Sequence, residues 1–155
     1  MFFVRNSYYK LKEEIAMIQI IAGEKGKGKT KHLIDRVNKA VESSTGNVIF
    51  LDKSTRHMYE VSNKVRLINV TDYPFITNEG FVGFLYGILS QDHDIEDVFI
   101  DSFLKVANVD ETNISHTIEE ISNISKLYNI NFTLSVSFNE EKLPDDVKEY
   151  VVVSL

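Results

Sequence analysis

The sequence predicts an α/β protein with three layers (α/β/α), in which helices cover both faces of a mostly parallel central sheet of about five or six strands. Two observations lead to this prediction. Short apolar segments alternate along the chain with longer segments of helical periodicity, as in parallel strands joined by crossover helices. The apolar segments are also mostly continuous, which is typical of strands buried on both faces.

Six segments have the length and the β-branched or aromatic composition of strands. The predicted strands are 17–22, 47–51, 65–70, 97–101, 131–137 and 150–154. Three segments between them carry apolar residues at spacings of three and four, which places these residues on one face of a helix. The predicted helices are 30–43, 79–90 and 112–128.

Length and composition exclude several classes of protein. The 155 residues fit one domain of ordinary size. The absence of Cys excludes a disulfide framework, a Cys-type zinc site and thiol catalysis. A formal net charge of -6 argues against general nucleic-acid binding, which depends on surplus Lys and Arg. No apolar run approaches a membrane span and no secretory signal is visible, so we expect a cytoplasmic protein that binds no membrane.

Residues 1–16 differ in their residue pattern from the segment that follows and resemble a short polar helix. Lys12-Glu13-Glu14 can be encoded by a purine-rich stretch that is similar to a bacterial ribosome-binding sequence, and two residues separate it from Met17. The extension is therefore either translated leader, with Met17 as the start, or a helix that packs on the domain. The sequence leaves both interpretations open.

The strongest signal is a glycine- and lysine-rich segment between the first predicted strand and the first predicted helix. It matches the phosphate-loop pattern G-x-x-x-x-G-K-[ST] without a mismatch, and it reads Gly23-Glu24-Lys25-Gly26-Lys27-Gly28-Lys29-Thr30. Glycines let successive N–H groups converge on phosphate oxygens, and the helix N-terminus adds partial positive charge. We expect Lys29 to reach the β- and γ-phosphates and the Thr30 hydroxyl to hold Mg²⁺.

This motif predicts a P-loop fold, with residues 17–155 as a single nucleotide-binding domain. The expected nucleotide is ATP, because the sequence has no Asn-Lys-x-Asp segment to specify guanine. Lys25 and Lys27 lie within the motif and Lys31 directly follows it. They concentrate positive charge at the predicted phosphate site of a chain that is acidic overall. They either attract and touch the phosphates or lie in solvent.

A phosphate loop normally works with an acidic residue at the end of a neighbouring strand. Asp101 ends the run Asp97-Val98-Phe99-Ile100-Asp101, and Asp52 ends the run 47–52. We favour Asp101 as the Mg²⁺-anchoring and catalytic carboxylate, together with Lys29 as the catalytic lysine. Two further polar residues are predicted at the same edge of the sheet, where ligands of doubly wound sheets lie: Arg56 as a phosphate or base contact, and Ser137 as a side chain that senses the γ-phosphate.

The order of loop strand, second strand, short third strand and acidic strand resembles the RecA-like branch of the P-loop NTPases, and within it the bacterial thymidine-kinase type. Residues 97–101 are similar to that group's acidic strand, and Ser54-Thr55-Arg56 is similar to its Asp-Thr-Arg segment. Two features differ. Ser102 stands where the family usually has a Glu that acts as base, and the chain has no Cys for the zinc ribbon that carries the thymidine pocket.

The sequence also resembles short stand-alone P-loop ATP-binding proteins of low-GC bacteria, some of which are labelled twitching-motility ATPases. Since Ser102 cannot orient an attacking water as a carboxylate does, the resemblance and the residues together predict a Mg-ATP-binding protein with slow or partner-dependent hydrolysis. The expected partner is an unidentified protein, and self-association is left open. Two alternatives remain: a small-molecule kinase that acts on a nucleoside-like substrate, and a catalytically silent nucleotide-binding subunit.

Overall fold

A computed structural model of the protein describes residues 17–73 and 77–155. Within these residues the chain forms one sheet of six parallel strands in the order β3-β2-β4-β5-β1-β6. The strands are β1 (Ile18–Ala22), β2 (Asn47–Asp52), β3 (Arg66–Asn69), β4 (Ile95–Ile100), β5 (Asn131–Val136) and β6 (Val151–Ser154). The predicted α/β fold is confirmed, and the sheet is parallel throughout.

The crossover segments are helical, as the periodicity predicts. The helices are α2 (Lys29–Ser43), α3 (Asn78–Gln91), α4 (Phe103–Val106), α5 (Ile114–Tyr128) and α6 (Asp145–Lys148), with 3-10 turns at Val70–Asp72 and Glu140–Lys142. Local capping explains two boundaries. The Thr77 hydroxyl accepts a hydrogen bond from the Gly80 amide (3.0 Å) at the start of α3, and Asn129, with φ 56°, ends α5 in a left-handed conformation.

Three predicted helices are confirmed to within two residues at each end, and α4 and α6 were not predicted. Each has only four residues, too few to show a helical period. The helix predicted in residues 1–16 lies outside the described part of the chain. No helix in residues 17–73 and 77–155 is both long and apolar enough to cross a membrane.

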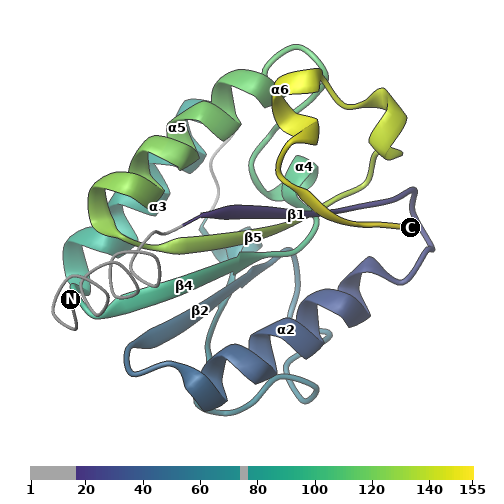
Figure 1. Ribbon diagram of the computed structural model, residues 1–155. Coiled ribbons are helices and arrows are strands. Elements are labelled where there is room, and N and C mark those ends of the chain that lie inside the picture. The colour runs from purple at the N-terminus through teal and green to yellow at the C-terminus, as the bar shows by residue number, and fades with distance from the viewer. Residues whose placement is uncertain (1–16, 74–76) are drawn as a thin grey trace, which may run out of the picture.

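The sheet separates two apolar cores, and helices lie on both sides of it (Figure 1). Helix α2 covers one face, where Leu33 and Val37 pack with Ile21, Phe50 and Phe99 from the strands. Helices α3, α5 and α6 cover the other face, where the larger core lies. Because both faces are covered, the strands are apolar on both sides, which is why their sequence shows little alternation.

The register of the sheet aligns the strand ends that follow these cores. Leu51 of β2 pairs with Ile100 of β4, and Ile100 pairs with Leu134 of β5. The residues that directly follow Leu51, Ile100 and Leu134 therefore form one row across the sheet. They are Asp52, Asp101 and Ser135. Successive side chains of a strand point to opposite faces, so this polar row belongs to the α2 face of the sheet, as do Phe50 and Phe99 two residues earlier.

Two glycine substitutions test the packing in opposite directions. In Gly46→Ala the new Cβ would overlap the backbone carbonyl oxygen of Asp94 and lie 2.6 Å from Cγ of Glu96, so we expect a destabilisation of about 1–3 kcal/mol. Gly87 is exposed in the middle of α3, and a Cβ there meets no atom within 4 Å, so Gly87→Ala should stabilise by about 0.5–1 kcal/mol. Urea titration of both variants measures these changes, and equal midpoints would contradict the packing described at Gly46.

Candidate functional site

The predicted phosphate loop connects β1 to α2 at the carboxyl end of the sheet (Figure 1). Gly26 and Gly28 both have φ +87°, a left-handed conformation that favours glycine. The Lys29 ammonium donates a hydrogen bond to the Glu24 carbonyl oxygen (2.9 Å) and so spans the loop. Lys29 is buried, and its burial lowers the pKa of its ammonium, while the nearby Asp101 carboxylate raises it by a smaller amount.

Asp101 lies beside the first turn of α2. The Thr30 hydroxyl donates to Asp101 Oδ2 (3.0 Å), and the Ser135 hydroxyl donates to Asp101 Oδ1 (2.6 Å). Asp101 is 3% exposed and Ser135 is 1% exposed. The structure thus brings together Thr30 and Asp101, the two predicted metal ligands. Ser135, which the sequence analysis did not single out, orients the carboxylate from the strand between β1 and β4.

Ser102 turns the chain sharply after the acidic strand. Its φ of 51° and ψ of 49° place it in the left-handed region, which is unusual for a residue other than glycine. Its amide donates a hydrogen bond to the Ser135 hydroxyl oxygen (2.8 Å). Ser135 therefore holds both the carboxylate of Asp101 and the strained backbone next to it. Strain of this kind is concentrated at functional sites.

Asp52 is the second carboxylate at this edge. It is 1% exposed, its Oδ1 accepts a hydrogen bond from the Lys53 amide (2.7 Å), and its buried Oδ2 has no hydrogen-bond partner. Burial, and then the charge of Asp101, raise the pKa of the Asp52 carboxyl. Sequence reasoning treated Asp52 and Asp101 as alternatives for one role, but the register places them side by side. The sequence signal for this pair of carboxylates was that two apolar runs both end in Asp.

A cavity of about 520 Å³ lies between the loop and the strand ends. It is lined by five cationic side chains, which are Lys25, Lys29, Lys53, Arg56 and Lys105. Thr30, Asp101, Ser135, Ser137 and the backbone of Gly26 and Gly28 also line it. Such a cationic hollow in a chain of net charge -6 suits a polyanion.

The predicted site residues therefore divide into two groups. Arg56, Ser137 and Lys25 line the cavity as predicted contacts would, whereas Gly23, Glu24, Lys27 and Lys31 do not line it. Lys27 and Lys31 are exposed, which agrees with the solvent alternative. The sequence analysis gave no role to Lys53 or Lys105, although both follow an acidic strand end within four residues, at Asp52 and Asp101 respectively.

The residues present fit the Mg²⁺ that the phosphate loop implies. Mg²⁺ prefers oxygen ligands, and Thr30 Oγ1 and Asp101 Oδ2 lie 3.0 Å apart beside the loop. The buried Oδ2 of Asp52, at the same edge of the sheet, has no hydrogen-bond partner. A buried carboxylate oxygen without a donor is costly unless a cation or proton satisfies it.

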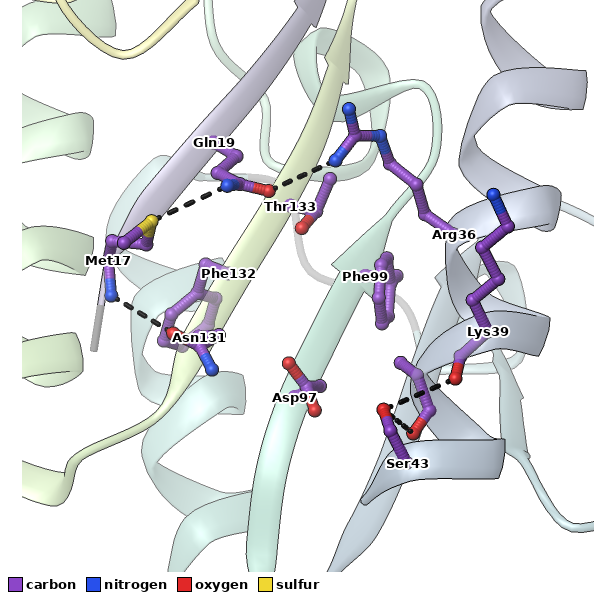
Figure 2. Close-up of a pocket in the computed structure, with 11 residues that line it drawn as sticks. Met17, Gln19, Arg36, Lys39, Ser43, Asp97, Phe99, Asn131, Phe132 and Thr133 are labelled. Carbon is purple, nitrogen blue, oxygen red and sulfur yellow. Dashed lines mark hydrogen bonds between the residues drawn. The ribbon is translucent and has the colours of Figure 1, made fainter. Parts of the chain in front are cut away.

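A second cavity, of about 430 Å³, lies at the opposite end of the same sheet face (Figure 2). Gln19, Asp97 and Thr133 line it from the strands, and Arg36 and Lys39 line it from α2. Arg36 donates a hydrogen bond to Gln19 Oε1 (3.3 Å), and Asp97 forms no ion pair in residues 17–73 and 77–155. Burial, and to a smaller extent Glu96, raise the pKa of the Asp97 carboxyl, and a hydrogen bond from Asn131 opposes this shift.

In the sheet, strand β5 lies between β1, which precedes the predicted phosphate loop, and β4, which precedes Asp101. A KaiC-like protein from the archaeon Pyrococcus horikoshii is similar (TM-score 0.63, 16% identity), with 88% of this chain and 71% of that chain covered. The flagellar accessory protein FlaH from Methanocaldococcus jannaschii is also similar (TM-score 0.54, 17% identity), with 84% and 64% covered. The chain thus spans less than two thirds of FlaH.

At this level of identity the similarities show the fold alone. No protein-family model and no curated protein matches the sequence. The narrower resemblances, to the thymidine-kinase type and to short P-loop proteins of low-GC bacteria, stay predictions.

Asp97 provides a test of the electrostatics at the second cavity. Its pKa in the folded protein lies above the ordinary value of 3.8, so the native state binds the proton more tightly than the unfolded chain does. Stability is then lost as the pH rises from about 3.8 through the raised pKa, and the cost is fully present at neutral pH. We expect Asp97→Asn to raise Tm by about 2–4 °C at neutral pH and to have no effect below the ordinary pKa.

Glu96 is the matched control for this prediction. The hydroxyls of Ser44 and Thr45 donate to its carboxylate (2.6 and 2.7 Å) and lower its pKa. Glu96→Gln should therefore lower Tm at neutral pH, whereas Asp97→Asn should raise it. Melting curves across the acid range measure both changes, and a lower Tm for Asp97→Asn at neutral pH would disprove the assignment.

Proposed function

We propose that residues 17–155 form a unit that binds ATP with Mg²⁺ and hydrolyses it slowly or only with a protein partner. The observation that supports this most is the hydrogen bond between Thr30 and Asp101 (3.0 Å), next to Lys29 at the opening of α2. Three groups with complementary roles in phosphoryl chemistry thus meet at one loop. The RecA-like fold and the cationic cavity are consistent with this function.

The triphosphate would lie along the loop, where backbone N–H groups and the N-terminus of α2 face it. Lys29 would donate to the phosphate oxygens, and Lys25, Lys53, Arg56 and Lys105 supply further positive charge around the cavity. Thr30 and Asp101 would hold Mg²⁺, which neutralises charge on the phosphates when it is bound. Ser137 lines the cavity from the residues that follow β5 and is the proposed contact to the γ-phosphate.

Hydrolysis needs a group that orients the attacking water. Ser102 occupies the position of the usual glutamate, and its own amide is engaged with Ser135. Asp52 is the carboxylate next to Asp101, and its Oδ2 has no donor. We assign to Asp52 the role of accepting the proton of that water. It is shorter by one carbon than a glutamate, which is consistent with slow turnover unless a partner closes the site.

The first test is nucleotide binding. Saturation at about 100 times the dissociation constant adds about 2.7 kcal/mol of stability, and for a chain of this size that raises Tm by about 5–10 °C. Thermal melts with Mg-ATP should show this rise for the wild type and not for Lys29→Ala. Lys27→Ala is the matched control, because Lys27 belongs to the same loop but is exposed and does not line the cavity. A full rise in Lys29→Ala would refute the assignment of the site.

The second test separates hydrolysis from binding. Asp52→Asn should keep the Tm rise with Mg-ATP but lower single-turnover hydrolysis by about 10²-fold, the lower end of the effect of a general base. Asp72→Asn is the control, since Asp72 follows β3 at the same edge but is exposed, whereas Asp52 is buried next to Asp101. Unchanged hydrolysis in Asp52→Asn would remove Asp52 from the mechanism.

One observation favours a small-molecule kinase as a second candidate. A further cavity of about 450 Å³ shares Lys53 and Lys105 with the phosphate cavity and extends to Val70, Thr71 and Tyr73. A phosphate acceptor bound there would lie beside the transferred group. Release of ADP with and without a pool of nucleosides tests this: stimulation supports the kinase, and an unchanged rate supports the ATPase.

A further inference from the structure

Three side chains that come from different parts of the chain converge beside the phosphate cavity. One ligand atom from each of Asp52, His57 and Asp101 lies within 4.8 Å of the other two. Asp52 ends β2, His57 belongs to the turn that follows β2, and Asp101 follows β4. The sequence analysis used the segment around His57 only for Arg56, so this histidine has no role in the proposed nucleotide site.

In the described residues, no salt bridge joins the carboxylates of this cluster to a basic side chain. Asp52 and Asp101 are 1% and 3% exposed, yet neither forms an ion pair with a Lys or Arg in the described residues. Thr30 and Ser135 donate to Asp101, but Oδ2 of Asp52 receives no hydrogen bond at all. An orphaned oxygen of this kind, next to a second buried carboxylate, is costly unless a cation or a proton satisfies it, and a bound metal ion is one such cation.

The contact between His57 and Glu60 is of the kind that orients metal-binding histidines. Its Nδ1 lies 2.6 Å from Glu60 Oε2, and its side chain is 19% exposed. A carboxylate acts only as an acceptor, so Nδ1 carries the proton in the neutral imidazole and Nε2 keeps its lone pair. Histidines that bind metals almost always donate their other ring N–H to a carboxylate or carbonyl in this way.

We propose that Asp52, His57 and Asp101 bind a divalent transition-metal ion, with Glu60 as the residue that orients His57. Two carboxylates and one imidazole suit ions such as Mn²⁺, Co²⁺ or Zn²⁺, whereas Mg²⁺ selects oxygen ligands. This ion is distinct from the Mg²⁺ proposed at Thr30, and Asp101 is common to both positions. Its binding requires neither the nucleotide nor the phosphate loop.

The consequence for hydrolysis rests on the proposed function. A metal ion on Asp52 occupies the oxygen that would accept the proton of the attacking water. The ion therefore acts as an inhibitor of the ATPase, and the ratio of transition metal to Mg²⁺ sets the turnover.

Mn²⁺ serves as the probe, because its electron spin reports a nitrogen bound directly to the ion. Untagged, nucleotide-free protein is titrated with Mn²⁺ by electron paramagnetic resonance, and the bound ion is examined for coupling to ¹⁴N. We expect coupling to one imidazole nitrogen in the wild type. His57→Gln should lose this coupling and bind Mn²⁺ at least ~10-fold more weakly, and Glu60→Gln should weaken binding by about 10-fold.

His116 provides the matched control. It also pairs with a glutamate, Glu120 (3.1 Å), but it is exposed on α5 and has no further carboxylate in a ligand cluster. His116→Gln should keep both the affinity and the nitrogen coupling. Far-UV circular dichroism confirms that each variant is folded before Mn²⁺ is added.

Two results would overturn the proposal: absence of nitrogen coupling in the wild type, or coupling that survives in His57→Gln. The Lys29→Ala protein separates this proposal from the proposed function, since it should lose the Tm rise with Mg-ATP but bind Mn²⁺ like the wild type. If the wild type shows the Mg-ATP rise and no nitrogen coupling, only the transition-metal site is disproved.

Discussion

The alignment of three parallel strands is the constraint on which the rest of the site depends. Leu51, Ile100 and Leu134 are paired across β2, β4 and β5 and pack in the core beneath α3 and α5. The residue after each of them lies on the α2 face, and these three residues are Asp52, Asp101 and Ser135. A slip of one residue in any strand would exchange its two faces. The position of the carboxylates is thus fixed by apolar contacts on the opposite side of the sheet.

The α2 face of the sheet has an apolar centre and polar ends. Ile21, Phe50 and Phe99 pack against Leu33 and Val37 in the middle. Asp101 and Ser135 lie at the carboxyl end, and Gln19 and Asp97 line a cavity at the amino end. Burial raises the pKa of Asp52 and of Asp97, so both ends carry an electrostatic cost. The apolar centre offsets this cost. The cavity at the carboxyl end is lined by the phosphate loop and by five cationic side chains, whereas Arg36 and Lys39 line the cavity at the amino end.

Local patterns in the sequence predicted most of the fold and part of the site. Continuous apolar runs and spacings of three and four residues located the strands and long helices, and the glycines and Lys29 located the loop. Strand order and register are long-range properties, so the contact of Asp52 with the neighbourhood of Asp101 could not be predicted. The left-handed Ser102, the role of Ser135 and the placement of His57 depend on that register as well. The four-residue helix α4, which carries Lys105 to the cavity, is too short for any periodic signal.

The hydrogen bond from Lys29 to the Glu24 carbonyl has a consequence for affinity and its measurement. The ammonium holds the loop in shape before a ligand arrives, so little conformational entropy is lost on association. In the proposed function, the same ammonium would exchange this carbonyl for a phosphate oxygen as the ligand enters. The affinity contributed by Lys29 would then be the difference between two hydrogen bonds, while removal of the side chain would also free the loop. Preorganisation and ligand contact are thus functions of one atom, Nζ of Lys29.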